Sequence, residues 1–394
     1  MSKIKVYRAN LPKVYLLSSL RWMLLIMPIV VLFYQENGLS MIQIMLLQSI
    51  FSVAIILFEI PSGYFSDVIG RKTTLVIGCV LGFLGFCIYS ISYNFQGFLA
   101  AEIIMGLGSS FISGTDSALI YDSLVEMGEA ERYVRFEGKK IAICNFSEGV
   151  ASIAGGFLAT ISLRTPFYFE TAMNFFTILV ALTLTEPDRH KFDISEGKIK
   201  GILSIVKFSM HDHREVKWLI IYSSLVGAST LTMVWLIQPY LKIAGLPIRF
   251  FGIVWAALNF AVGIFSFNAH KFEALLGRKR TLISLIFLTA VGYFLVAAFQ
   301  KLWAIGFLLI FYFVRGINSP VLKDYLNRLI TSDKRATVLS VQGMIGRLIF
   351  ALVGPFIGWV TDIYSLSCAL AISGTTFFVF GLVALVFLRL HHGL

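Results

Sequence analysis

The strongest constraint on this chain is that long apolar stretches recur along nearly its whole length. A helix that crosses a lipid bilayer needs about 20 mostly apolar residues. Stretches of this kind lie at residues 11–34, 41–66, 73–92, 95–121, 140–163, 166–185, 216–241, 250–272, 281–299, 302–326, 336–360 and 366–388. Hydrophobic residues make up 57% of the 394 residues and charged residues only 14%, which argues against a water-soluble enzyme and against a disordered chain. The sequence therefore predicts an all-α membrane protein with twelve transmembrane helices.

Basic residues are distributed unevenly among the connections between these helices. The connections at 35–40, 93–96 and 362–365 contain no lysine or arginine, whereas the alternate connections and the termini are rich in both. By the positive-inside rule, the basic side faces the cytoplasm and both termini lie there. The first apolar stretch is long enough to span and is not followed by a cleavage site. We therefore expect a multi-pass protein of the cytoplasmic (inner) cell membrane without a cleaved signal peptide.

A long polar segment divides the helices into two sets of six. We predict an N-terminal bundle at residues 1–185, a cytoplasmic linker at 186–215 and a C-terminal bundle at 216–394. The halves share sequence, because residues 70–75 recur as 277–282 and residues 114–124 resemble 316–326. Matches at equivalent places in two halves of the same orientation predict two pseudo-symmetric six-helix bundles.

The sequence lacks motifs for catalysis or metal binding. No phosphate-binding loop or zinc-protease motif occurs, and the four cysteines lie in apolar stretches without CxxC spacing. The linker sequence His211-Asp212-His213 has no further ligands at fixed spacing, so we interpret it as a solvated loop. The basic loops are not interleaved with aromatic residues, which argues against nucleic-acid binding. We expect no enzyme activity, no cofactor and no metal, and a monomer driven by an ion or substrate gradient.

Charged residues inside the predicted helices are the main candidates for function. A charge at mid-bilayer costs about 2.5–3.5 kcal/mol on insertion scales. Seven such residues are Arg21, Glu59, Glu102, Asp116, Glu148, Arg315 and Arg347. They should face a water-filled cavity or pair with one another. The alternative is that they form static pairs that fix helix packing, which we favour for Glu148 and Arg347.

The acidic residues among them are candidates for proton coupling. If residues 95–121 form a regular helix, Glu102 and Asp116 share a stripe about 80° wide with Gly106, Ser109 and Ser113. Asp122 then points about 240° away from Asp116, which suggests a separate role. Carboxyl groups in a poorly solvated pocket can load and unload protons near neutral pH. The proton-coupling candidates are therefore Glu59, Asp116, Glu102 and Glu148.

A second set of residues is expected to line a substrate cavity. Arginine side chains would hold carboxylate counter-ions or an anionic substrate group, and aromatic and amide side chains would bind an amphiphile. The candidates are Arg21, Arg315, Arg347, Gln238, Asn259 and Trp235. For the aromatic residues, interfacial or lipid-facing packing is the alternative interpretation.

Residues 63–72 resemble the signature loop of the major facilitator superfamily, G-x-x-x-D-x-x-G-R-[KR], and lie between the second and third helices as in that family. The resemblance implies two six-helix bundles, transport by alternating access and a cavity lined by helices one, four, seven and ten. It also implies a cytoplasmic gate formed by Gly63, Asp67, Gly70, Arg71 and Asp122.

The chain departs from this pattern at several positions. In the second-half copy of the loop, Ala274 stands where the aspartate is expected, with Glu273 one residue earlier. Glu102 stands where drug/proton antiporters of the family often carry arginine, and residues 151–156 lack the proline of their helix-five motif.

The resemblance and the buried charges predict a secondary active transporter that exports a small organic or amphiphilic compound by proton-coupled alternating access. Its partners would be that compound, protons or another ion, and the lipid bilayer, without nucleic acid. One alternative is an ion-coupled importer of an anionic solute. Another is a membrane receptor or scaffold that keeps the fold without transporting.

Overall fold

The computed structural model describes residues 3–187 and 207–391, and within these ranges it contains helices and no strand. Contacts divide the chain into two compact units. The first unit comprises Met1–Leu39, Ile50–Asp193 and Ile248–Ala256, and the second comprises Ser40–Ser49, Ile194–Pro247 and Ala257–Leu394. Most of the linker expected at 186–215 lies outside the described residues.

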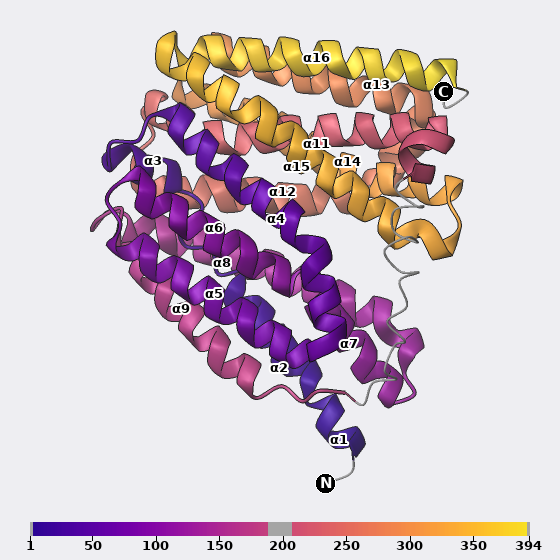
Figure 1. Ribbon diagram of the computed structural model, residues 1–394. Helices are drawn as coiled ribbons and strands as arrows, with labels where there is room; N and C mark the ends of the chain where they lie inside the picture. Colours follow the sequence, from indigo (N-terminus) through magenta and orange to yellow (C-terminus); the bar gives the residue numbers. More distant parts are fainter. Residues whose placement is uncertain (1–2, 188–206, 392–394) are drawn as a thin grey trace. The chain divides into compact units, whose positions relative to one another are not determined.

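In the first unit, one helix packs on two others that follow it in the sequence. The helices are α1 (Lys3–Arg8), α2 (Asn10–Arg21), α3 (Val30–Glu36), most of α4 (Met41–Ile69), α5 (Arg71–Ile91), α6 (Phe95–Ile112), α7 (Thr115–Glu126), α8 (Tyr133–Leu158) and α9 (Thr165–Leu182), with a 3-10 turn at Ala130–Arg132. Helix α5 packs on both α6 and α9 (Figure 1). Buried side chains of α2, α5 and α7, among them Leu17, Leu75 and Leu119, form one core cluster.

The second unit is arranged around its longest buried helix. Its helices are α11 (Arg214–Ile243), most of α12 (Phe251–Phe267), α13 (Ala269–Ala298), α14 (Leu308–Leu329), α15 (Ser332–Ile363) and α16 (Leu366–Leu390), with a π turn at Phe208–Asp212 and a 3-10 turn at Leu302–Phe307. Helix α11 contacts α14, α15 and α16, and α13 runs beside α16 (Figure 1). The 3-10 turn Ile248–Phe250 that precedes α12 belongs to the first unit.

The helices have the length and surface of a membrane protein, which confirms the predicted fold class. Ten segments of the described residues are long and apolar enough to cross a bilayer. Two further predicted spans correspond to α2 with α3 and to the 18-residue α9. Large apolar side chains such as Phe380, Leu352 and Phe176 are exposed, as expected for surfaces that face lipid.

The first predicted span is not one continuous helix, and that prediction is wrong in this respect. Helix α2 ends at Arg21 and α3 begins at Val30, with non-helical residues 22–29 between them. Pro28 explains the interruption, because proline has no N–H to donate and disfavours helical geometry at the preceding residue, Met27.

The fourth span is also broken, at Ser113 and Gly114. Gly114 has a φ of 76°, which glycine adopts without the steric cost that a Cβ would add. The stripe expected from a regular helix therefore ends at Ile112, and its extension to Asp116 is wrong. The separation of Asp116 from Asp122 is unaffected, because both residues lie within α7.

Two helices are divided between the units. Helix α4 begins in the second unit and continues in the first, and α12 begins in the first unit and continues in the second. In the second unit, the N–H groups of Met41 and Ile42 donate to the two carboxylate oxygens of Asp362, each at 2.8 Å. This satisfies donors at the start of α4 and places a negative charge at its N-terminus. In the first unit, the start of α12 touches α8 so closely that a Cβ on Gly252 would lie 1.9 Å from the Ser152 carbonyl oxygen. Small residues permit this close contact between helices.

Replacing Gly252 with alanine should destabilise the protein by about 1–3 kcal/mol or more, because the added methyl group overlaps the α8 backbone. Thermal unfolding of the purified protein measures the effect. Gly263→Ala in the same helix is the matched control, since no atom lies within 4 Å of its added Cβ. Equal Tm values for the two variants would contradict this packing.

Candidate functional site

The predicted gate residues come together around one guanidinium group in the first unit. Arg71 Nη1 lies 2.7 Å from Asp67 Oδ1, and Arg71 Nε lies 3.1 Å from Asp122 Oδ2. Arg71 Nη1 also donates to Ser66 Oγ at 2.9 Å. The Arg71 side chain is only 15% exposed, so these charge-assisted contacts are partly shielded from water. The loop thereby joins the end of α4, the start of α5 and α7.

Gly70 forms the turn before Arg71, and a carboxylate accepts hydrogen bonds from the N–H groups that follow it. Gly70 has a φ of 126°, and the following N–H groups of Arg71 and Lys72 donate to Glu186 at 2.9 and 2.7 Å. Glu186 therefore satisfies the first donors of α5. Gly63 is exposed on α4 with no atom within 4 Å of an added Cβ, so packing alone does not require glycine there.

In the second unit, the residues at the equivalent positions form different ion pairs. Arg278, the counterpart of Arg71, pairs with Glu215 at 2.9 Å and lies over the Tyr325 ring. Asp324, the counterpart of Asp122, pairs with Arg328 at 2.7 Å. Tyr325 Oη donates to Glu273 at 2.9 Å. The repeated sequence therefore keeps the counterparts of Arg71 and Asp122, but not that of Asp67 and not the central arginine bridge.

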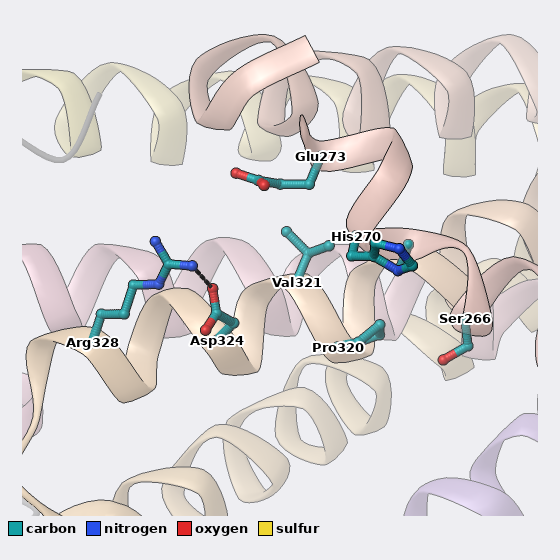
Figure 2. A pocket seen from close by; sticks show the side chains of 8 residues that line it. Ser266, His270, Glu273, Pro320, Val321, Asp324 and Arg328 are labelled. Atoms are coloured by element: carbon teal, nitrogen blue, oxygen red, sulfur yellow. Dashed lines mark ion pairs between the residues drawn. The ribbon is translucent and has the colours of Figure 1, made fainter. Parts of the chain in front are cut away.

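A cavity of about 330 Å³ occupies this place in the second unit. Figure 2 shows Glu273 and His270 of the α13 side facing Asp324 and Arg328 of α14 across it, with Pro320 and Val321 on its floor. Among the described residues, no group of three or more His, Cys, Asp or Glu side chains is arranged to hold a metal ion.

Asp116 lies in a buried polar network in the first turn of α7. Lys140 Nζ of α8 lies 3.0 Å from Asp116 Oδ2 and 2.8 Å from Glu137 Oε1, and it donates to Ser117 Oγ at 2.6 Å. Ser117 in turn donates to Glu137 Oε1 at 2.9 Å, and its N–H donates to Asp116 Oδ1 at 2.7 Å. The Lys140 side chain is only 8% exposed. Two carboxylates thus share one buried ammonium group.

Glu102 lies in a different environment, among aromatic rings. It is 4% exposed, and its Oε1 accepts from Tyr34 at 2.9 Å and from Tyr89 at 2.5 Å, while the two hydroxyl groups also bond to each other. Phe98 and Phe33 pack on the tyrosines. The structure therefore places Glu102 and Asp116 in separate networks.

The two remaining proton-coupling candidates lie elsewhere in the first unit. Glu148 of α8 accepts from the Trp255 indole N–H at 3.2 Å, which joins it to the start of α12. Glu59 is half-buried on α4, and its carbonyl oxygen accepts from Ser62.

The substrate-cavity candidates differ in exposure. Arg21 is half-buried at the last residue of α2, where the negative end of the helix dipole also favours a cation. Arg315 is exposed on α14, although that helix is apolar enough to span a bilayer. Gln238 and Trp235 are buried on α11, whereas Asn259 and Arg347 are half-buried on α12 and α15.

Comparison with known proteins decides the family. A sequence model described as Major Facilitator Superfamily matches residues 14–353. The chain belongs to this superfamily. Its members are transporters and not enzymes, and the chain is a multi-pass membrane protein of this class.

Individual relatives are distant. The chain is 22% identical to the MFS-type transporter YxaM of Bacillus subtilis (strain 168) over 354 residues, which is 86% of each chain. It is 24% identical to the quinolone resistance protein NorA of Staphylococcus aureus (strain Mu50 / ATCC 700699) over 160 residues, 41% of this chain and 40% of that protein. A mutant form of the nucleoside transporter NupG superposes with a TM-score of 0.82 at 14% identity, over 98% of this chain and 99% of that one. This superposition shows the superfamily fold.

The sequence patterns did not predict Lys140 and Glu137 of the Asp116 network, nor Glu170, a buried acidic residue of α9. Lys140 and Glu137 lie beside the basic residues 132–139, which resemble a solvated loop end, and only a helix extended back to Tyr133 places them against α7. Glu170 lies near the start of an apolar stretch and carries no motif. Only the presence of an acidic residue within a predicted transmembrane helix could have indicated a functional role for Glu170.

Replacing Arg71 with alanine should lower the free energy of unfolding by about 1.5–3 kcal/mol, because Asp67 and Asp122 lose their shared partner. The matched control is Arg328→Ala, whose partner Asp324 has the same i,i+4 spacing. That pair is exposed, with the Arg328 side chain 71% accessible, so the variant should unfold like the wild type. Equal losses in thermal unfolding would show that the Arg71 bridge adds no stability.

Proposed function

We propose that this superfamily member exports a small organic or amphiphilic compound in exchange for protons, by alternating access across the cytoplasmic membrane. The observation that carries the proposal is the buried network in which Asp116 and Glu137 share the Lys140 ammonium group. The proposed export rests further on the partial similarity to the quinolone resistance protein NorA.

The network lies deep enough to be costly in lipid. Asp116 lies ten residues before the end of α7, about 15 Å along the helix, and Lys140 lies seven residues after the start of α8, about 10 Å along it. These distances are about a third to a half of the thickness of the hydrocarbon layer. A charged group at such depth requires a functional or structural reason.

The charge balance of the network suggests how a proton would act. With all three groups ionised, two carboxylates and one ammonium group carry one net negative charge. One added proton makes the network neutral, and a neutral network costs less to remove from water. We infer that proton binding favours conformations in which the network is occluded, and that release requires contact with water.

The Arg71 bridge would act as the cytoplasmic gate in this cycle. The positive-inside pattern places its loop and both termini on the cytoplasmic side. Because Arg71 joins α4, α5 and α7 through two carboxylates, breaking the bridge would free these helices to move against one another. Glu59, Glu102 and Glu148 remain further candidates for proton binding.

One observation supports the ion-coupled import of an anionic solute as a second candidate function. Arg315 exposes a guanidinium group on a helix that can span the bilayer, and such a group binds carboxylates and phosphates well. NupG, which shares the fold, is a nucleoside transporter. Transport direction in everted vesicles and in whole cells distinguishes export from import, and absence of transport in both would favour a receptor or scaffold.

Neutralising either shared carboxylate should abolish proton coupling. In everted vesicles with an imposed pH gradient, Asp116→Asn and Glu137→Gln should no longer drive accumulation of norfloxacin, a fluorescent quinolone, while exchange of norfloxacin at equal pH continues. The reason is that each variant makes the network neutral without a proton.

The matched control is Glu131→Gln, which neutralises an exposed residue of the adjacent turn and should leave accumulation unchanged. If Asp116→Asn and Glu137→Gln accumulate norfloxacin as well as the control does, the network does not couple transport to protons.

A further inference from the structure

The break in the first span leaves backbone groups that need partners inside the membrane. Helix α2 holds 12 residues, about 18 Å of helix, so residues 22–29 lie near the middle of the hydrocarbon layer. In lipid, backbone N–H groups must be satisfied by the protein itself. Local turns satisfy some of them, as when the Ile29 N–H donates to the Ile26 carbonyl at 2.9 Å.

A carboxylate from a distant helix satisfies the centre of the break. Glu170 Oε2 of α9 accepts from the Leu25 N–H at 2.7 Å. Glu170 is only 1% exposed. This hydrogen bond joins residues 145 positions apart.

A glycine on a third helix lets the break pack against α8. A Cβ on Gly155 would lie 1.9 Å from the Leu25 carbonyl oxygen and 2.8 Å from its carbon. Any other residue would therefore displace the segment. The break is held from α9 by a hydrogen bond and from α8 by contact.

The corresponding helix of the other half shows that the fold does not require this break. Helix α11 occupies the equivalent position in the repeat and runs unbroken for 30 residues, even through Pro239. A continuous first helix would satisfy its own backbone and would not need a buried carboxyl group, which is costly to remove from water. The cost is unexplained unless the break is used.

We propose that Glu170 is a positioning residue that holds the break between α2 and α3, and that α2 and α3 change their mutual angle there during transport. The inference rests on the proposed transport function, but it does not depend on proton coupling. The positioning role requires an acceptor oxygen at residue 170 and does not require a negative charge there. Through the end of α2, Glu170 also fixes the position of Arg21, a substrate-cavity candidate.

Two substitutions at residue 170 distinguish a requirement for an acceptor oxygen from a requirement for a negative charge. Glu170→Gln keeps an oxygen that accepts from Leu25, so amide hydrogen exchange at residue 25 should stay slow. Glu170→Leu removes the oxygen, so exchange there should become fast. Asn174→Leu is the matched control, since it removes a buried polar group of α9 that bonds within α9, and it should leave this exchange slow. Fast exchange in Glu170→Gln, or slow exchange in Glu170→Leu, would overturn the positioning role.

A double variant tests whether the break itself is used. Pro28→Ala with Glu170→Leu should restore a continuous helix, and the protein should fold because the helix satisfies its own backbone. Spin labels at Leu16 and Glu36, both exposed, report the distance across the break. In proteoliposomes without a pH gradient, the wild type should show two distances and the double variant one.

A single distance in the wild type, or two distances in the folded double variant, would overturn the inference. Neither measurement uses a proton gradient or a substrate. A negative result in the proton-coupling experiment would therefore leave the distance measurement valid. A negative result in the distance measurement would leave the proton-coupling experiment valid.

Discussion

The structure depends on one constraint, which is that polar groups at bilayer depth must find partners within the protein. A related device recurs at helix starts and at the helix break. Asp362 and Glu186 each accept from two consecutive backbone N–H groups, at residues 41 and 42 and at residues 71 and 72, and Glu170 accepts from the N–H of residue 25. Each joins segments far apart in sequence, so the same bonds that satisfy the backbone also fix where helices start, break and meet.

The two halves share sequence but use it differently. The repeat places Arg71 and Arg278 at equivalent positions, yet only Arg71 bridges two carboxylates. The first and fourth spans are broken, whereas their counterparts α11 and α14 are continuous. The buried Lys140 network also belongs to the first unit. These differences place the arginine bridge, the buried lysine network and the two broken spans in the N-terminal part of the chain.

The apolar pattern was sufficient to predict the fold class, because the length of a span is set by the bilayer and not by details of packing. The signature loop was sufficient to place Asp67, Arg71 and Asp122 together. Helix breaks escaped prediction, since Pro28 and Gly114 interrupt the backbone without interrupting the hydrophobicity. Lys140 escaped because its neighbours are basic and its burial depends on tertiary contact with α7. Local composition cannot reveal such partners when they are brought together only by packing.

The central claim is that polar residues of the spans line a solvated route that opens to one side of the membrane at a time. Ser113 at the break of the fourth span and Ser319 on α14 are exposed serines that accept a cysteine with little change in size. In a background without the four native cysteines, their reaction with membrane-impermeant thiol reagents from each side is the most direct test. The account predicts that both react and that substrate shifts the reactive side. Cysteines that stay unreactive from both sides, with and without substrate, would contradict it.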